Sequence, residues 1–287
     1  MLTELAGRTA VVTGAASGIG LGLAQQCRAR GMNVAMLDVE AGALEASAAL
    51  VGGEEHVLAL RADVSDAEAM EAVAAEVYER FGAVHLLCNN AGVSITGPLW
   101  EMTDKDWRWV INVNLLGVAN GIRSFVSRMV AGGEEGHVVS TSSLAGLTPM
   151  PHAGIYSATK SAVIALSESL FFDLQDAGTR IGVSVLCPGL VNTNILRSDR
   201  NRPHGATETG EEAIPDEALS FFQMGDSPND VADHVLDAVA RDDFIILTGE
   251  GGRPDMEARA AATLALTQPH RPNPAAMMPD SFHSKKS

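Results

Sequence analysis

The sequence has few cysteines and few cations. Its 287 residues include three cysteines, and 20 lysines and arginines stand against 36 aspartates and glutamates, which gives a net charge of −16. A surface of this sign repels nucleic acid and anionic membranes, so neither is expected as a partner. The cysteines, Cys27, Cys88 and Cys187, are odd in number and scattered in apolar contexts. They are predicted to be buried free thiols in a reducing cytoplasm rather than a disulfide framework.

Long apolar runs and metal-binding patterns are also missing. No stretch approaches the roughly 18–20 consecutive apolar residues of a membrane span, and the first residues, MLTELAGRTA, do not look like a signal peptide. The eight histidines are dispersed, and no histidine or cysteine pair has the close spacing of a metal site. Hydrophobic residues still make up 46% of the chain, which is enough for a full core. We therefore expect a folded protein that binds no metal.

Short β-rich runs alternate with helical patterns along most of the chain. The runs are apolar throughout, as in strands that are covered by helices on both faces. They lie at residues 9–14, 33–39, 56–64, 84–92, 136–143, 181–189 and 243–249. Three capping signals mark helix starts: Ser65-x-x-Glu68, Thr103-x-x-Asp106 and Ser227-Pro228-x-Asp230. Strands that alternate with helices in this way predict an α/β fold with one doubly wound, seven-stranded parallel sheet.

Two regions interrupt the alternation. Residues 194–226 fall between the sixth strand and the last helix of the sheet, and we expect them to form an inserted substrate lid. Residues 251–287 follow the last strand, and we expect a helix at 255–266 and an irregular, proline-rich tail. The chain is thus predicted to have a catalytic domain over residues 1–250, which includes the lid, and a C-terminal extension over 251–287.

A glycine-rich turn, Thr13-Gly14-Ala15-Ala16-Ser17-Gly18-Ile19-Gly20, follows the first strand and opens a helix. Its glycines let the backbone approach a pyrophosphate, and the helix offers free N–H groups and its positive dipole end. Such a turn can also be a plain strand–helix corner, but its position after the first strand favours a dinucleotide site. Asp38, at the end of the second strand, can accept hydrogen bonds from ribose hydroxyls. Its alternative role is to cap a helix over residues 41–50.

Two further strand ends carry candidate cofactor contacts. Asp63 and Val64 end the third strand and can border an adenine, although Ser65 and Asp66 beside them are also ordinary cap residues. The fourth strand closes with Asn89-Asn90-Ala91-Gly92. Gly92 permits close approach of the backbone to a dinucleotide, and the asparagines can tie neighbouring strands together.

The most specific signal is Tyr156-Ser-Ala-Thr-Lys160 in a helical stretch. Residues four apart share one helix face, and a lysine ammonium near a phenol lowers the tyrosine pKa from about 10 by roughly 1–3 units. The tyrosine then serves as a general acid or base, the alternative being a surface pair. Ser143 ends the fifth strand, where its hydroxyl can hold a substrate oxygen. Asn114 is polar in an apolar helix, so it either packs that helix or anchors a water beside Lys160.

These motifs, together with Pro188-Gly189-x-x-x-Thr193, resemble the short-chain dehydrogenase/reductase family in order and spacing over roughly residues 5–250. The resemblance implies a Rossmann fold, a nicotinamide cofactor and four catalytic residues. Tyr156 would be the acid/base, Ser143 would orient the substrate oxygen, Lys160 would lower the Tyr156 pKa and hold the nicotinamide ribose, and Asn114 would carry a relay water. The implied cofactor contacts are Gly14, Ser17, Gly18, Ile19, Gly20, Asp38, Asp63, Val64, Asn90, Gly92, Tyr156, Lys160, Pro188, Gly189, Val191 and Thr193.

The expected reaction is hydride transfer between NAD(H) and a secondary alcohol or ketone. NAD is expected rather than NADP because Asp38 repels a 2′-phosphate, and residues 14–20 contain no cation. The predicted substrate pocket is apolar and suits a bulky molecule. Its candidate residues are Ile95, Leu99, Trp100, Leu144, Met150, Leu190, Ile195, Leu196, Phe221, Phe222 and Met224. The sequence is also similar to the branch of the family that oxidises aryl secondary alcohols, including lignin-derived ones.

The sequence allows more than one interpretation of a basic stretch, of the oligomeric state and of the class of protein. The basic stretch from Arg197 to His204 either receives a substrate anion or is a solvated lid surface. The helix over residues 156–176 is apolar or small nearly all round, so we expect a homo-oligomer, a tetramer or a dimer. A sugar epimerase or dehydratase shares Tyr-x-x-x-Lys but usually has a separate substrate domain. A non-catalytic dinucleotide sensor tends to lose the tyrosine or the lysine, and both are present here.

Overall fold

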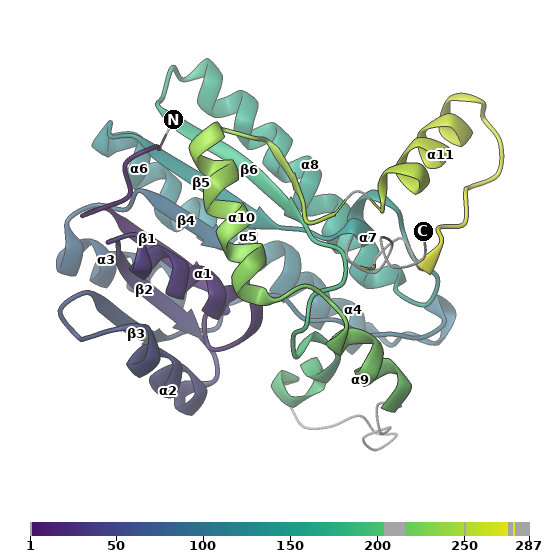
Figure 1. The fold of residues 1–287 in the computed structure, drawn as a ribbon, viewed down its shortest axis with the longest axis horizontal. Coiled ribbons are helices and arrows are strands. Elements are labelled where there is room, and N and C mark those ends of the chain that lie inside the picture. Colours follow the sequence, from purple (N-terminus) through teal and green to yellow (C-terminus); the bar gives the residue numbers. More distant parts are fainter. Residues whose placement is uncertain (1, 204–215, 250, 275–277, 279–287) are drawn as a thin grey trace.

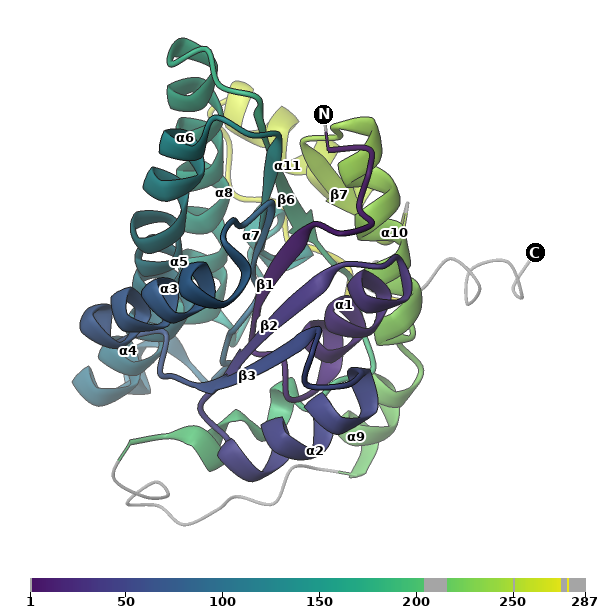
Figure 2. The ribbon, with the colours of Figure 1, turned by 90° about the vertical axis from the view of Figure 1, so that its left-hand side faces the viewer.

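Seven parallel strands form one sheet between two layers of helices in the computed structural model, which describes residues 2–203, 216–249, 251–274 and 278 (Figures 1 and 2). The strands are β1 (Thr9–Thr13), β2 (Asn33–Asp38), β3 (Val57–Arg61), β4 (Leu86–Asn89), β5 (Gly136–Thr141), β6 (Ile181–Cys187) and β7 (Ile245–Leu247). Their order in the sheet is β3-β2-β1-β4-β5-β6-β7. The predicted α/β fold is confirmed, and the strands are shorter than the sequence runs suggested.

Helices cover both faces of the sheet, as Figure 2 shows edge-on. One face carries α1 (Gly18–Ala29), α2 (Ala41–Val51) and α10 (Pro228–Arg241), and the other carries α3 (Ala67–Phe81), α5 (Gly117–Gly121), α6 (Ser127–Gly132) and α8 (Gly154–Asp176). Neighbouring residues of β1 therefore enter different cores. Val12 packs with the core of α1 and α10, and Val11 packs with the core of α3 and α8. This two-sided burial explains why the strands read as continuous apolar runs.

The strand order changes direction beside β1. The chain runs outward from β1 through β2 to β3, then returns to place β4 on the other side of β1. In open parallel sheets, ligands bind outside the carboxyl ends of the strands at such a switch point. The predicted site residues Gly14, Asn90 and Ser143 follow strand ends at this edge, and Asp38 is the last residue of β2.

The first and the last helix on one face of the sheet touch backbone to backbone. A Cβ atom on Gly22 of α1 would lie 2.6 Å from the carbonyl oxygen of Pro228 in α10. At the other end of α1, Arg30 forms ion pairs with Asp233 and Asp237 at 2.7 and 2.9 Å. The helix that follows the glycine-rich turn is thus held in place by a segment that is distant in the sequence.

The capping signals were partly correct. Thr103 and Asp106 form the predicted capping box at the start of α4 (Asp104–Ile111). The cap of α3 is Asp66 and not Ser65, because the Asp66 carboxylate accepts hydrogen bonds from the backbone N–H groups of Glu68 and Ala69. Ser227 is the N-cap of α10, and Pro228 is the first residue of that helix, but the Ser227 side chain makes no capping hydrogen bond.

Two segments lie outside the alternation, as expected. The predicted lid contains the short helices η4 (Ile195–Asn201) and α9 (Asp216–Gln223), and its residues 204–215 lie outside the described residues. The C-terminal extension contains α11 (Arg253–Leu264), close to the predicted range. Figure 1 shows α11 projecting from the body beside α7 (Leu144–Leu147). No helix in the described residues is long and apolar enough to cross a membrane.

The described tail returns to α11. The carboxylate of Asp255 lies 2.7 Å from Nε2 of His270 and accepts a hydrogen bond from the backbone N–H of Asn273 at 2.9 Å. Residues 275–277 and 279–287 of the predicted tail lie outside the described residues. The three cysteines are free and buried, as predicted.

Candidate active site

The glycine-rich turn folds as a tight corner between β1 and α1. Gly14 has a φ of +66°, and a Cβ atom there would lie 2.9 Å from the Cα atom of Ala91. A Cβ atom on Gly20 would lie 2.0 Å from the carbonyl oxygen of Gly14, so no side chain fits. Ser17, the N-cap of α1, makes no side-chain capping bond, and the first turn has no acidic residue. The first N–H groups of α1 are therefore suited to an anion such as a pyrophosphate.

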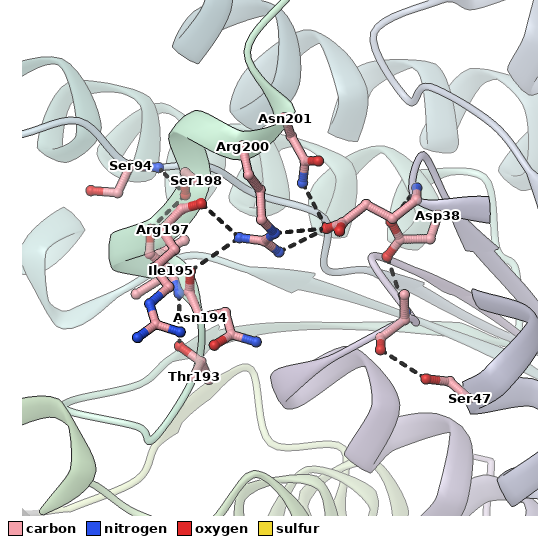
Figure 3. Close-up of polar contacts among 12 residues, drawn as sticks. Asp38, Ser47, Ser94, Thr193, Asn194, Ile195, Arg197, Ser198, Arg200 and Asn201 are labelled. Atoms are coloured by element: carbon pink, nitrogen blue, oxygen red, sulfur yellow. Dashed lines mark hydrogen bonds and ion pairs between the residues drawn. The ribbon is translucent and has the colours of Figure 1, made fainter. Parts of the chain in front are cut away.

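The Asp38 side chain stabilises this turn by hydrogen bonds to the backbone. One carboxylate oxygen accepts a hydrogen bond from the backbone N–H of Ala16, and the other accepts from the backbone N–H of Glu40, each at 3.0 Å (Figure 3). The N-cap residue of α2 is Glu40, so Asp38 does not act as the helix cap that the sequence left open. A carboxylate oxygen can accept more than one hydrogen bond, so the half-buried Asp38 keeps acceptor capacity for ribose hydroxyls.

The residues after β3 and β4 differ in their roles. Asp63 is exposed, and its carboxylate accepts hydrogen bonds from the backbone N–H and the hydroxyl of Ser65. Asn90 ties the strands as expected, since it donates to the Thr13 carbonyl at 3.0 Å and accepts from the Thr141 hydroxyl at 3.2 Å. Asn89 does not tie strands, because its buried amide has no hydrogen-bond partner in the described structure.

Val64 and Gly92 both lie in tight surroundings. Val64 is buried, and a Cβ atom on Gly117 would lie 2.7 Å from its side chain. A Cβ atom on Gly92 would lie 3.3 Å from Nζ of Lys160 and 3.5 Å from Oδ1 of Asn114. A glycine at position 92 therefore leaves room directly beside two predicted catalytic side chains.

Helix α8 brings Tyr156 and Lys160 to the end of β5. The Lys160 ammonium lies 5.6 Å from the centroid of the Tyr156 ring and donates a hydrogen bond to the Thr141 carbonyl at 2.7 Å. The Ser143 side chain lies near enough to Tyr156 to lower the pKa of the phenol, and it accepts a hydrogen bond from the Ala145 backbone at 3.1 Å, which caps α7. The structure thus places Ser143, Tyr156 and Lys160 together.

Burial dominates the electrostatics of this cluster. Burial raises the pKa of Tyr156, and the hydrogen bond with Ser143 opposes part of this rise. Burial also lowers the pKa of Lys160 to about 8. The net direction for Tyr156 is opposite to the lowering expected from the lysine, because the cost of creating a charge in this buried site is the larger effect. At neutral pH the phenol is protonated in this arrangement.

Asn114 lies in η2 (Asn112–Leu116), a π-helical turn between α4 and α5. Its side chain accepts from the Val93 backbone N–H at 2.8 Å and donates to the Val93 carbonyl at 2.9 Å and to the Thr159 hydroxyl at 3.2 Å. The side chain therefore fills the packing role that the sequence offered as one alternative.

The segment after β6 forms the opposite wall of the site. The Pro188 carbonyl accepts from the Leu144 backbone N–H at 2.9 Å, and the Gly189 N–H donates to the Thr248 hydroxyl at 3.1 Å. Val191 is buried and forms a parallel bridge with Asp226. A Cβ atom on Gly18 would lie 3.1 Å from the Thr193 side chain, so Thr193 faces the glycine-rich turn.

The predicted pocket residues differ widely in exposure. Leu144 and Leu190 are buried, at 5% and 1% exposure, and pack within the protein. Trp100 is 85% exposed. Leu99 lies between these extremes and contacts Gly154, two residues before Tyr156.

Two arginines of the basic stretch are engaged within the protein. Arg200 pairs with Glu40 at 2.8 Å, and Arg202 pairs with Asp106 at 2.7 Å. Both guanidinium groups are paired, so neither arginine is a free anion receptor, although Arg200 is exposed to solvent; His204 lies outside the described residues. Glu40 was not among the predicted site residues, because nothing in the neighbouring sequence marks a partner 160 residues away.

The fold and this site define a dinucleotide-binding protein with a tyrosine–lysine pair at the switch point. A family model described as short chain dehydrogenase matches residues 8–204, and the chain belongs to this family. It is 36% identical to a C alpha-dehydrogenase of Sphingobium sp., over 93% of this chain and 88% of that protein. It is also 36% identical to a 1-deoxy-11-beta-hydroxypentalenate dehydrogenase of Streptomyces arenae, over 84% and 82% of the two chains.

A solved structure is similar as well. A short chain dehydrogenase/reductase from Burkholderia phymatum, in complex with NAD, is 38% identical, with a TM-score of 0.87. The similarity covers 94% of this chain and 99% of that chain.

Proposed function

We propose that the protein is an NAD(H)-dependent oxidoreductase that interconverts a bulky, apolar or aryl secondary alcohol and its ketone. The observation that carries this proposal is the meeting of Ser143, Tyr156 and Lys160 beside the glycine-rich turn. The names of the two relatives support it, since both are dehydrogenases and one name gives a hydroxylated compound as substrate.

The residues present fit NAD. The uncapped start of α1 suits the pyrophosphate, and Asp38 has acceptors for the adenosine ribose but no neighbouring cation in residues 14–20 for a 2′-phosphate. Lys160 would hold the nicotinamide ribose, and the segment from Pro188 to Thr193 would hold the carboxamide. NAD held there would supply the hydride acceptor for the alcohol carbon, and the protein's residues would supply position and proton transfer.

Four residues of the protein have different roles in proton transfer at the substrate oxygen. The Ser143 hydroxyl holds this oxygen by a hydrogen bond, and Tyr156 exchanges a proton with it. Because the Tyr156 pKa is raised, the phenol at neutral pH is poised to donate a proton to a ketone oxygen. The Lys160 ammonium stabilises the phenolate that forms. Asn114 carries the water that returns the proton.

One experiment tests this proposal most directly. The purified protein is given NAD and a panel of secondary alcohols, with aryl members and simple aliphatic ones, and the appearance of NADH absorbance is followed. Turnover is expected, with higher kcat/KM for the bulky or aryl members. An epimerase, a dehydratase or a dinucleotide sensor would bind NAD and release no net NADH, and that outcome would overturn the proposal.

A further inference from the structure

Residues 193–202, called the strap below, lie across the carboxyl edge of the sheet (Figure 3). On the side of β4 the strap is firmly fixed. Ser198 is 3% exposed, and its hydroxyl accepts a hydrogen bond from the Ser94 backbone at 3.1 Å. Arg202 pairs with the buried Asp106 and stacks over Trp109, with its guanidinium carbon 4.8 Å from the ring centroid.

On the side of β2 the strap is held by one carboxylate. Oε1 of Glu40 accepts hydrogen bonds from Nε of Arg200 at 3.0 Å and from Nδ2 of Asn201 at 2.9 Å, and Nη2 of Arg200 lies 2.8 Å from the same oxygen. Nη1 of Arg200 donates to the Arg197 carbonyl at 2.8 Å and to the Asn194 carbonyl at 3.3 Å. A single guanidinium thus organises the first turn of the strap and connects it to Glu40 (Figure 3).

The contacts of Glu40 and Arg200 connect a residue at the adenosine end of the proposed dinucleotide site with a residue at its nicotinamide end. The backbone N–H of Glu40 donates to Asp38, which faces the adenosine ribose in the proposed function. Asn194 follows Thr193, which faces Gly18 of the glycine-rich turn and belongs to the nicotinamide end. The contacts run from Asp38 through Glu40 and Arg200 to Asn194, and so pass from one end of the site to the other.

We infer that Glu40 is a positioning residue for the cofactor: through Arg200 it ties the strap to the ribose loop, and this ion pair must open before the dinucleotide leaves. The inference rests on the proposed function in so far as NAD occupies the site. A half-exposed ion pair adds little to the stability of a fold, so this one has no large structural role. Its position makes it a determinant of the rate at which the site opens.

Glu40 carries the negative charge that its ion pair with Arg200 requires. Burial alone would raise the pKa of Glu40, but the hydrogen bonds from Asn201 and Arg200 outweigh burial and lower it. Glu40 is therefore ionised throughout the neutral range. The anchor at Asp106 and Trp109 is separate, so loss of the Glu40 contact leaves the strap attached on the side of β4.

The test measures NADH dissociation without substrate. NADH is displaced from the protein by excess NAD in a stopped-flow fluorimeter, for the wild type, Glu40→Gln, Arg200→Gln and the double variant. Glu40→Gln removes the charge and keeps the backbone N–H that donates to Asp38. Glu71→Gln is the matched control, because Glu71 forms a half-exposed ion pair with Arg128 between α3 and α6, away from the strap.

Each single variant is expected to release NADH about 3- to 10-fold faster than the wild type, and the double variant no faster than the quicker single one. Raising NaCl from about 0.05 to 0.5 M is expected to speed release from the wild type and leave the variants unchanged. Equal dissociation rates in the wild type and Glu40→Gln, or additive effects of the two substitutions, would overturn the inference.

Hydrogen–deuterium exchange gives a second readout in the protein without NADH. Backbone amides of residues 193–202 are expected to exchange faster in Glu40→Gln than in the wild type or Glu71→Gln. Unchanged exchange in this segment would count against the connection. These results are independent of turnover: normal NADH binding with no effect of Glu40 overturns only the inference, and NADH binding without alcohol oxidation overturns only the proposed reaction.

Discussion

The carboxylate of Asp38 accepts a hydrogen bond from the backbone N–H of Ala16 at 3.0 Å, across 22 residues of sequence. The side chain that we propose for the ribose therefore also fixes the shape of the turn that we propose for the pyrophosphate. A change at position 38 acts on both parts of the cofactor site at once.

We expect the protein to prefer NAD over NADP by about 10²–10³ in kcat/KM, because the Asp38 carboxylate repels a 2′-phosphate. Asp38→Ala should lower NAD affinity at least about tenfold and relax the preference. Adding Val39→Arg should move it toward NADP, since Val39 is 38% exposed, whereas Ala16 is buried and has no room for arginine. Steady-state kinetics with both cofactors measure this, with Glu45→Ala on α2 as control. Equal kcat/KM for both cofactors in the wild type would contradict the assignment of Asp38.

Tyr156→Phe should reduce kcat by at least about 10²–10⁴-fold while NADH binding stays within about twofold, because only the proton carrier is removed. The matched control is Tyr78→Phe, which removes the hydroxyl of the second tyrosine of the chain. The Tyr78 hydroxyl is buried and has no hydrogen-bond partner in the described structure, so its loss should leave kcat unchanged. Turnover numbers and NADH fluorescence titrations separate the two effects. Retention of more than a tenth of the wild-type rate by Tyr156→Phe would remove Tyr156 from the mechanism.

The two directions of the reaction should have opposite pH dependences. Burial raises the pKa of Tyr156, so the phenolate needed to accept a proton from an alcohol accumulates only as pH rises. Alcohol oxidation should therefore increase over pH 7–10, and ketone reduction should decrease. Lys160, with its pKa lowered to about 8, titrates in the same range, so the apparent values belong to the pair. Initial rates in both directions measure the profiles, and parallel profiles would speak against Tyr156 as the shared acid and base.

His137 should make the fold sensitive to acid. Its ring is fully buried between β5 and β6, with Nε2 2.7 Å from the Ser184 hydroxyl and Nδ1 3.6 Å from the Asp242 carboxylate. Burial lowers the pKa of His137 to about 4, so the folded state keeps it neutral while the unfolded chain binds a proton below pH about 6.5. The free energy of unfolding should fall as pH drops from about 6.5 to 4, by on the order of 3 kcal/mol from this group.

Urea unfolding at a series of pH values measures this slope. His137→Gln is expected to flatten it, whatever its effect on stability at pH 7. His85, whose pKa burial also lowers, contributes a smaller part in the same direction. An unchanged slope in His137→Gln would assign the acid sensitivity to other groups.

The protein is expected to form a homo-oligomer through the outer face of α8. Phe172 on this face is 58% exposed and lies edge-on to Phe171, with their ring centroids 5.7 Å apart. Light scattering at micromolar concentration should give the mass of a dimer or a tetramer. Phe172→Glu should lower this mass, and Leu50→Glu, at the still more exposed position 50 of α2 in the opposite layer, should not. A monomeric mass for the wild type would refute the expectation.

The sheet was predictable because both faces of its inner strands, such as β1, β4 and β5, are buried, so the apolar runs of the sequence contain the strands. The start of α3 was misplaced by one residue, since Ser65 and Asp66 are both good caps and only the backbone geometry selects Asp66. The proximity of Ser143, Tyr156 and Lys160 was predictable from two patterns. Ser143 lies just beyond the end of a strand, and Tyr156 and Lys160 lie one helical turn apart.

Three other features could not be predicted from the sequence. The π-helical turn at Asn114 depends on the register of the backbone and not on a residue type. The sign of the Tyr156 pKa shift depends on how deeply α8 buries the phenol. The Glu40–Arg200 pair joins two residue types that are common on any surface, so only the folded chain identifies them as partners.

The backbone contact between Gly22 and Pro228 has a consequence for how the protein is made. The glycine-rich turn leaves the ribosome early, whereas α10, which holds α1 in place, is synthesised about 200 residues later. Contacts between residues that are so far apart in the sequence form slowly. The nascent chain therefore carries every residue of its glycine-rich turn long before it can bind NAD. A truncation or a stalled translation product that lacks α10 should lose cofactor binding at the far end of the sequence, although no residue of the turn has been altered.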